Sequence, residues 1–304
     1  MSSFTRALFV TARQQLSGGW SAPVDPWLRQ LALRAAALTS VLRPSASRAA
    51  MTSCYGPHGL PMLLGHRGAM ARAPENTLGA FQAALDDGAH GVELDTTLAG
   101  DSIPVVLHDD TLDRTTTVHG KPSDFDADEL ADVDAGSWFA GWGVESVPRL
   151  DDALAMMPDG AVVNVELKGP TPAWAGLEKN VVDVISRHTP RVKILVSSFH
   201  PAQLLEVRRI QPSVPIGVLL WPQSTLALRT AWQVPLLAPD AVHPPSSIVD
   251  RAFMDAARAS GLRVHVYAVA GTADAQRLLD LGVDGLIVDD VAAHAPLFGR
   301  GRQR

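Results

Sequence analysis

Short apolar runs alternate with longer amphipathic segments along the chain from residue 62 onward. The runs predict eight strands, at residues 62–64, 91–94, 161–167, 192–196, 216–220, 236–242, 263–269 and 285–288. Apolar residues at helical spacing predict helices at 77–86, 176–188, 201–209, 248–259 and 273–281, whereas 222–235 has no clear period. Repeated strand–helix units over about 240 residues favour an α/β fold of the closed (β/α)₈ TIM-barrel type. A doubly wound sheet is the alternative, but no glycine fingerprint follows the first strand.

A ninth apolar run, at 103–107, follows the second strand too closely for a parallel crossover. We therefore predict an antiparallel hairpin that turns between Gly100 and Asp101 and sets Glu93 opposite His108. Residues 113–149 then carry Gly, Pro, Asp and aromatic residues without a period, and they are too long for an ordinary connection. We interpret them as a small insertion, after the second-strand hairpin, over the mouth of the barrel.

The composition narrows the class of protein. The chain has 304 residues, of which 46% are hydrophobic and 19% charged, with a formal net charge of −6. An acidic chain is a poor surface for nucleic acid, so no nucleic-acid partner is expected. Cys54 is the only cysteine, which excludes an internal disulfide and a thiolate zinc cluster. A reducing compartment fits this usage, and the sequence favours a cytoplasmic location.

Residues 1–50 differ from the rest of the chain. They hold six arginines, no lysine and one acid, which gives +5 here and −11 for residues 51–304. We divide the chain at this point into a basic extension and a barrel, with Met51 as an alternative start. No apolar stretch near the start reaches the roughly 18 residues that span a bilayer. Three interpretations stay open: an organellar transit peptide, a segment that rests on a membrane, and a leader without a separate role.

The membrane interpretation rests on residues 26–42, which can form an amphipathic helix. The expected apolar face comprises Trp27, Leu28, Leu31, Leu33, Leu38 and Val41, and the expected basic border comprises Arg29, Arg34 and Arg43. An apolar face bordered by arginines suits the surface of a bilayer. Peripheral membrane contact through residues 1–50 is therefore one expectation.

Three carboxylates lie on predicted strands at spacings that direct them to a common side. Glu93 and Asp95 are two residues apart, as are Glu166 and Lys168, and such pairs point to the same face of a strand. An unpaired carboxylate inside a barrel costs several kcal/mol or becomes protonated, so Glu93, Asp95 and Glu166 require a cation. Oxygen ligands suit one divalent ion, Mg²⁺ or Ca²⁺, with Mn²⁺ as a third candidate. The alternative is a set of structural ion pairs with neighbouring Arg or Lys.

Two histidines lie at predicted strand ends. His66 begins a His-Arg-Gly sequence after the first strand, and His108 begins a His-Asp pair after the hairpin. Two imidazoles can share acid and base work, because both titrate near neutral pH. Arg67 and Lys168 add positive charge for a phosphate. A metal, two cations and an acid/base pair indicate phosphoryl transfer, although a histidine at a strand end can also be purely structural.

The remaining candidates are less specific. Asn76 is expected to cap a helix that starts near residue 77, with Glu75 in a positioning role. Trp138 and Phe139 in the insertion could line a substrate rim, or simply anchor the loop. His200 and Tyr267 follow predicted strands and are candidates for ligand contact. No Gly-x-Ser-x-Gly motif occurs at Ser197 and Ser198, which weakens a serine-hydrolase interpretation.

In this order the motifs resemble the glycerophosphodiester phosphodiesterase family over roughly residues 62–290. They are Gly65-His66-Arg67-Gly68, Pro74-Glu75-Asn76-Thr77, Gly91-Val92-Glu93-Leu94-Asp95, Val105-Val106-Leu107-His108-Asp109, Leu112-Asp113-Arg114-Thr115-Thr116, Val165-Glu166-Leu167-Lys168, Ser197-Ser198-Phe199 and Gly282-Val283-Asp284-Gly285-Leu286-Ile287-Val288-Asp289. The resemblance implies a TIM barrel with a small insertion. It also implies that His66 and His108 form the acid/base pair, that Glu93, Asp95 and Glu166 bind the metal, and that Arg67 and Lys168 contact phosphate. Tyr267 departs from the family, which commonly has Trp on that strand.

The expected activity is therefore metal-dependent hydrolysis of a glycerophosphodiester, a small molecule, to glycerol 3-phosphate and an alcohol. One alternative is a lysophospholipase D or sphingomyelinase-D-like activity on lipid diesters. Another is a catalytically idle barrel that binds phosphodiesters. The preferred alcohol, the identity of the metal and the oligomeric state stay open.

Overall fold

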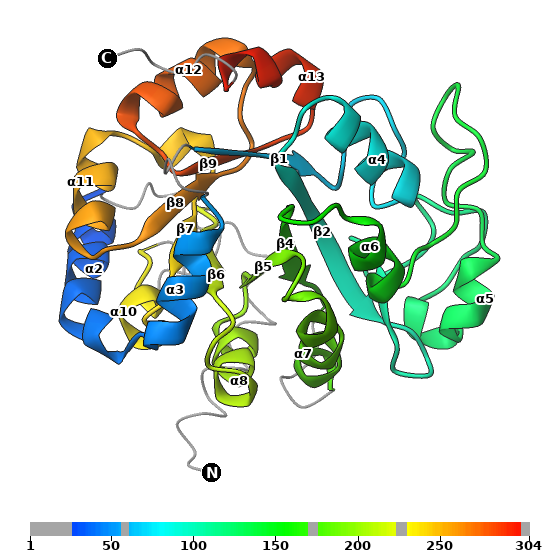
Figure 1. The fold of residues 1–304 in the computed structure, drawn as a ribbon, viewed down its shortest axis with the longest axis horizontal. Coiled ribbons are helices and arrows are strands. Elements are labelled where there is room, and N and C mark those ends of the chain that lie inside the picture. Colours follow the sequence, from blue (N-terminus) through cyan, green and yellow to red (C-terminus); the bar gives the residue numbers. More distant parts are fainter. Residues whose placement is uncertain (1–25, 56–60, 170–175, 223–229, 299–304) are drawn as a thin grey trace, which may run out of the picture.

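The computed structural model describes residues 26–55, 61–169, 176–222 and 230–298 (Figure 1). All nine strands form one sheet: β1 (Met62–His66), β2 (Gly91–Leu98), β3 (Pro104–Val106), β4 (Val162–Leu167), β5 (Lys193–Ser198), β6 (Ile216–Leu219), β7 (Ala241–His243), β8 (Arg263–Val266) and β9 (Gly285–Val288). The eight strands other than β3 pair in parallel, and β1 pairs with both β9 and β2, which closes the sheet. The predicted TIM barrel is confirmed.

Helices connect the strands and cover the outside of the barrel. They are α4 (Leu78–Asp86), α5 (Ala127–Ala131), α6 (Leu150–Met156), α7 (Leu177–His188), α8 (Pro201–Ile210), α10 (Gln233–Leu237), α11 (Arg251–Ala259), α12 (Thr272–Leu281) and α13 (Val291–His294). Short 3₁₀ turns add η2 (Pro122–Asp124), η3 (Ser246–Ile248) and η4 (Ala295–Leu297). Phe81, Leu154 and Leu278 are fully buried on these helices and pack in the main core outside the strands.

Several predicted boundaries are wrong, among them the end of the second strand, which is predicted at 94 and lies at Leu98. The run at 236–242 is not one strand, because Leu236 and Leu237 end α10 and β7 begins only at Ala241. Ala238 between them has a left-handed backbone with φ of 44°, which breaks the extended path. The strand predicted to 269 ends at Val266, and the helix predicted from 248 begins at Arg251 after η3.

The antiparallel hairpin is present, but its predicted register is wrong by one residue. Thr96 pairs with Val106, and Leu107 N donates to Asp95 O at 3.1 Å, so Glu93 is not opposite His108. The physical reason is the turn. It contains three residues, with Ala99 N donating to Ile103 O at 3.0 Å and Ser102 in the left-handed region at φ 66°. A three-residue turn is centred on one residue, which shifts every pair along the hairpin.

The insertion lies between β3 and β4, as predicted, and contains η2 and α5. It has a small core of its own, in which Leu112, Leu130 and Val147 pack against Val105 and Leu107 of the hairpin. The hairpin and the insertion therefore form one unit beside the barrel.

Two helices precede the barrel, α2 (Pro26–Thr39) and α3 (Ser45–Ser53), with the turn η1 (Ser40–Leu42) between them. In Figure 1, α2 lies beside α10 and α11 on the outside of the barrel. Two features of the expected amphipathic face are wrong. Leu33 is buried against the barrel with Ala32 and Ala36, and Arg29 and Arg43 are buried as well. The buried side of α2 therefore includes two alanines, Ala32 and Ala36, together with Leu33.

The helix α3 spans residue 50, the boundary drawn from the sequence, and leads into the amino end of the barrel. Met51, Cys54 and Tyr55 pack there against the first residues of the strands, among them Met62 of β1 and Val162 of β4. A cluster of apolar side chains therefore covers this end of the barrel, and Tyr55 Oη lies 2.5 Å from His265 Nε2 within it. In the part of the chain that the structure describes, no helix has the length and apolar content needed to cross a bilayer.

Candidate active site

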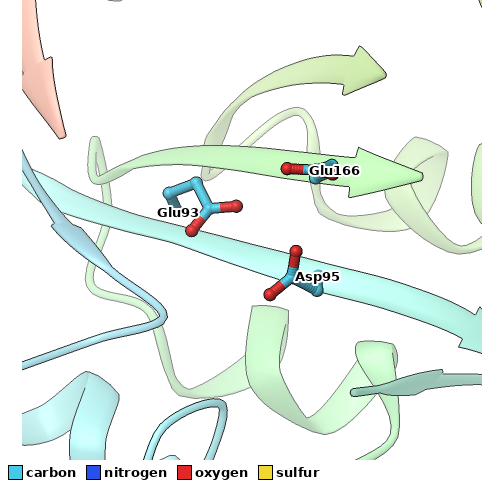
Figure 2. Close-up of side chains that lie close together, drawn as sticks. All are labelled: Glu93, Asp95 and Glu166. Atoms are coloured by element: carbon cyan, nitrogen blue, oxygen red, sulfur yellow. The ribbon is translucent and has the colours of Figure 1, made fainter. Parts of the chain in front are cut away.

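Three carboxylates meet inside the carboxyl end of the barrel (Figure 2). Glu93 and Asp95 come from β2 and Glu166 from β4, and one oxygen of each lies within 4.8 Å of the others. The parallel register sets Asp95 beside Glu166, and the spacing of two residues brings Glu93 to the same face. All three side chains are buried, with at most 8% of a residue exposed. The expected acidic cluster is therefore present in space.

Burial and mutual repulsion perturb these carboxyl groups. Burial, together with the charge of Asp95, raises the pKa of Glu93 to about 8. The pKa of Glu166 is raised as well, chiefly by burial. Burial also acts to raise the pKa of Asp95, but the charges of Lys168 and Arg67 outweigh it and hold that pKa below its ordinary value. Without a further cation, part of this cluster holds protons at neutral pH.

Two cations contact the cluster. Lys168 Nζ lies 2.9 Å from Glu166 Oε1 and 3.5 Å from Asp95 Oδ1. Arg67 Nε lies 3.3 Å from Asp95 Oδ2, and its backbone N–H donates to Glu93 Oε2 at 3.1 Å. Such contacts are the ion pairs with neighbouring Arg or Lys that were the alternative to a metal site. They do not offset the whole cluster, because the pKa values of Glu93 and Glu166 stay raised.

His66 ends β1 and is oriented by an aspartate that directly follows the last strand, β9. Its Nδ1 lies 2.6 Å from Asp289 Oδ1, although the two residues are 223 positions apart in sequence. The other nitrogen, Nε2, lies 3.9 Å from Glu93 Oε2 on the side of the acidic cluster. Burial lowers the pKa of His66, but the bond to Asp289 and the charge of Glu93 outweigh it, so the pKa is raised.

His108 has a similar partner from its own loop. Its Nδ1 lies 2.5 Å from Asp109 Oδ1. Arg114 donates from Nε to Asp109 Oδ2 at 2.6 Å, and its two terminal nitrogens donate to both oxygens of Glu75, at 2.7 and 2.8 Å. Arg67 donates to the same Glu75 carboxylate at 2.7 Å. A continuous chain of charged hydrogen bonds thus joins His108 to Arg67, and burial lowers the pKa of His108.

The backbone between β1 and α4 brings these groups together. Arg67 and Asn76 both have left-handed backbones, with φ of 52° and 60°, and Gly68 passes so close to Ala80 that a Cβ would lie 2.6 Å from its carbonyl carbon. Asn76 is not the helix cap predicted from the sequence. Thr77 caps α4 and accepts from Ala80 N, while Asn76 Nδ2 donates to Asp95 Oδ2 at 2.8 Å.

The four candidate pocket residues divide into two groups. His200 and Tyr267 follow β5 and β8 at the carboxyl end of the barrel, and Tyr267 Oη donates to Leu220 O at 2.8 Å. Burial lowers the pKa of His200, and the charge of Lys168 acts in the same direction. Burial raises the pKa of Tyr267, and the charge of Glu166 adds to this effect. Trp138 and Phe139 contact each other at a ring distance of 5.6 Å within the insertion. Among the described residues, these two rings make no hydrogen bond or ring contact with the cluster.

Comparison with known proteins decides the family. Residues 66–293 match the model of the glycerophosphoryl diester phosphodiesterase family. The chain belongs to this family. A glycerophosphodiester phosphodiesterase of Caldanaerobacter subterraneus subsp. tengcongensis is 31% identical over 243 residues, which cover 79% of this chain and 98% of the relative. The resemblance stated from the motifs is confirmed.

Solved structures of this phosphodiesterase family share the fold. An Oleispira antarctica phosphodiesterase in complex with the product sn-glycerol-3-phosphate has a TM-score of 0.65 and 30% identity, covering 77% of this chain and 94% of that one. A glycerophosphodiester phosphodiesterase from Agrobacterium tumefaciens has a TM-score of 0.66 and 29% identity, covering 78% of this chain and all (100%) of that one. The family model leaves residues 1–65 and 294–304 unmatched.

In this phosphodiesterase, the sequence pattern predicts no role for Asp289 or Arg114. The role it predicts for Asn76, the cap of a helix, is wrong. Asp289 directly follows β9, and side chains after barrel strands meet at the carboxyl end, so its position was a usable signal. No comparable signal exists for Arg114, because its contact with Glu75 joins the insertion to the β1–α4 loop. Only the fold brings those two segments together.

Proposed function

We propose that this chain hydrolyses glycerophosphodiesters to glycerol 3-phosphate and an alcohol, with one divalent cation. The observation that carries the proposal is the buried set of Glu93, Asp95 and Glu166, with oxygens within 4.8 Å of one another and His66 at its border. Family membership supports the reaction type, and the Oleispira antarctica relative was solved with sn-glycerol-3-phosphate.

The residues of the cluster fit a metal ion. They offer only carboxylate oxygens and they are buried. Burial, with the negative charge of Asp95 as the next cause, raises the pKa of Glu93 to about 8. Glu93, Asp95 and Glu166 would hold the ion. Mg²⁺ and Ca²⁺ suit such ligands, and Mn²⁺ is the third candidate. When bound, the ion supplies charge that stabilises phosphoryl oxygens in the transition state.

The cations and the histidines of the chain supply the remaining chemistry. Arg67 and Lys168 hold the phosphate oxygens, since both present charge at the cluster. Asp289 and Asp109 each occupy Nδ1 of a histidine, so Nε2 of His66 and of His108 is the nitrogen that exchanges protons with substrate. One imidazole takes the proton of the nucleophile, and the other gives a proton to the leaving alcohol oxygen as its bond to phosphorus breaks.

The nucleophile is water or the 2-hydroxyl of the glycerol. The second route forms a cyclic phosphate, which water then opens while the histidines exchange their roles. Phosphorus NMR during turnover distinguishes the two, because only the second route gives a cyclic signal. We propose that His200 and Tyr267 contact the glycerol or the leaving alcohol, and that Trp138 and Phe139 form the outer rim.

Turnover assays of two variants test the proposal. His66→Ala and His108→Ala should each lower kcat by about 10²–10⁴, the usual contribution of a positioned acid or base. His119→Ala is the matched control, because His119 also pairs with an aspartate, Asp113, at 2.9 Å but is 82% exposed in the insertion. Unchanged turnover in either of the first two variants would remove that histidine from the mechanism.

Metal dependence needs a separate test. Glu93→Gln should weaken binding of Mg²⁺, Ca²⁺ or Mn²⁺ measured by calorimetry, and excess chelator should abolish turnover of the wild type. Full activity in chelator would contradict a metal-dependent reaction. Phosphodiester binding without turnover across all three ions would instead indicate the catalytically idle barrel.

Substrate panels separate the remaining alternatives. Faster turnover of lysophosphatidylcholine than of glycerophosphocholine would favour the lysophospholipase D-like activity.

A cytoplasmic location is proposed on the strength of the single cysteine, Cys54, which is free and buried.

A further inference from the structure

Exposed apolar side chains gather on one part of the surface. Of the twelve large apolar side chains that are exposed among the described residues, five lie on α2 and η1: Trp27, Leu31, Leu38, Val41 and Leu42. Two more, Trp232 and Leu236, lie at the start of α10 and within it. The helix α2 packs against α10 (Figure 1), and we name these seven exposed residues the α2–α10 patch.

The exposure of the patch is unusual for side chains of this kind. Leu38 is 82% exposed, Val41 79% and Leu236 80%, although other residues of α2 and α10 are fully buried. Ala32, Leu33 and Ala36 already anchor α2 to the barrel. The patch is therefore a second apolar face that the packing of α2 leaves open, and an apolar cluster of this size marks an interaction surface.

The charge around the patch selects the partner. Residues 26–50 and 230–239 contain four arginines and no acidic residue, in a chain whose net charge is −6. Arg34 and Arg48 are exposed there. A second copy of the chain facing the patch would set these arginines against arginines. An anionic surface would meet them favourably, and Trp and Leu beside Arg is the composition of helices that rest on bilayers.

We propose that the α2–α10 patch docks this protein on an anionic lipid bilayer, with α2 and α10 lying against the headgroups. This surface differs from the face predicted from the sequence, because Leu33 points into the protein and α10 supplies Trp232 and Leu236. The proposal concerns binding alone and does not depend on the proposed reaction.

Vesicle sedimentation with the full chain tests the proposal. Vesicles of phosphatidylcholine are compared with vesicles that also contain phosphatidylglycerol. The wild type should bind the second kind, and the triple variant Leu38→Gln, Leu42→Gln, Leu236→Gln should bind them about 10-fold or more weakly, because each leucine loses its insertion. Replacing Arg34 and Arg48 by Gln should weaken binding about fivefold per charge, and only on anionic vesicles.

A matched pair of variants serves as the control. Val41→Gln and Val144→Gln remove the same side chain at nearly equal exposure, 79% and 78%, but Val144 lies in the insertion. Only Val41→Gln should weaken binding, and circular dichroism should show both variants folded. No binding by the wild type, equal binding by the triple variant, or a dimer in light scattering that the triple variant abolishes would each overturn the proposal.

Discussion

Replacement of Asp289 by Asn tests how the fold orients His66. The Asp289 carboxylate lies 2.6 Å from His66 Nδ1, with 63% of the Asp289 side chain exposed and 27% of the His66 side chain. A hydrogen bond to a charged group contributes about 1.5–3 kcal/mol, and the exposure of Asp289 places this one at about 1–2 kcal/mol. At about 1.4 kcal/mol per factor of ten, the variant Asp289→Asn should lower kcat about 5- to 30-fold.

The pH dependence gives the same test a second readout. Asp289 is one of the groups that raise the pKa of His66, so its neutralisation lowers that pKa. In a pH profile of kcat for glycerophosphocholine, the activity that requires protonated His66 should then be lost at a lower pH in Asp289→Asn than in the wild type.

The adjacent Asp290 provides the control. Asp290→Asn removes the same charge one residue away, and Asn still caps α13 as Asp290 does by accepting from Ala293 N at 3.0 Å. This variant should keep the kcat and the pH profile of the wild type. The reasoning fails if Asp289→Asn leaves kcat unchanged, or if both variants lose activity equally.

Three further predictions follow from the contacts and the buried groups. Arg114→Met breaks the contacts of Arg114 with Asp109 and Glu75, and the lost orientation of His108 and Arg67 should lower kcat about 5- to 10-fold. Arg72→Met is the control and should not lower kcat, because Arg72 has a similar side-chain exposure (46% against 45%) but belongs to another ion pair. His265 is buried and desolvation lowers its pKa to about 3 from 6.5, so the unfolded chain gains a proton first as the pH falls. Because of this ring, the free energy of unfolding should therefore drop by about 1.4 kcal/mol per pH unit below about pH 6.5. Urea denaturation at pH about 6 and about 4 should show a smaller loss of stability in His265→Gln than in the wild type. An equal loss in both proteins contradicts the assignment. Burial raises the pKa of Cys54 to about 12, so Ellman's reagent at pH about 8 should react only after unfolding, and immediate reaction of the native protein would be evidence against this burial.

Much of the barrel could be predicted from local pattern. The strands at 285–288 and 91–94 were recognised because buried parallel strands are short continuous apolar runs. The shared face of Glu93 and Asp95 followed from the alternation of side chains along a strand, which needs no knowledge of the fold. The hairpin register could not be predicted in this way, because it depends on how many residues the turn contains. Ser102 in the turn adopts a left-handed backbone, which a serine does not predict.

The sequence by itself determined where strands and helices alternate and which carboxylates share a strand face. Both depend on the periodicity of apolar and polar side chains over a few neighbouring residues. Tertiary packing decided the rest. It set Asp289 against His66, and it joined Arg114 of the insertion to Glu75. It also decided that α2 buries Leu33 and leaves Leu38 exposed. Such contacts join segments distant in sequence, and their geometry depends on the packing of the whole chain, so no local pattern contains them.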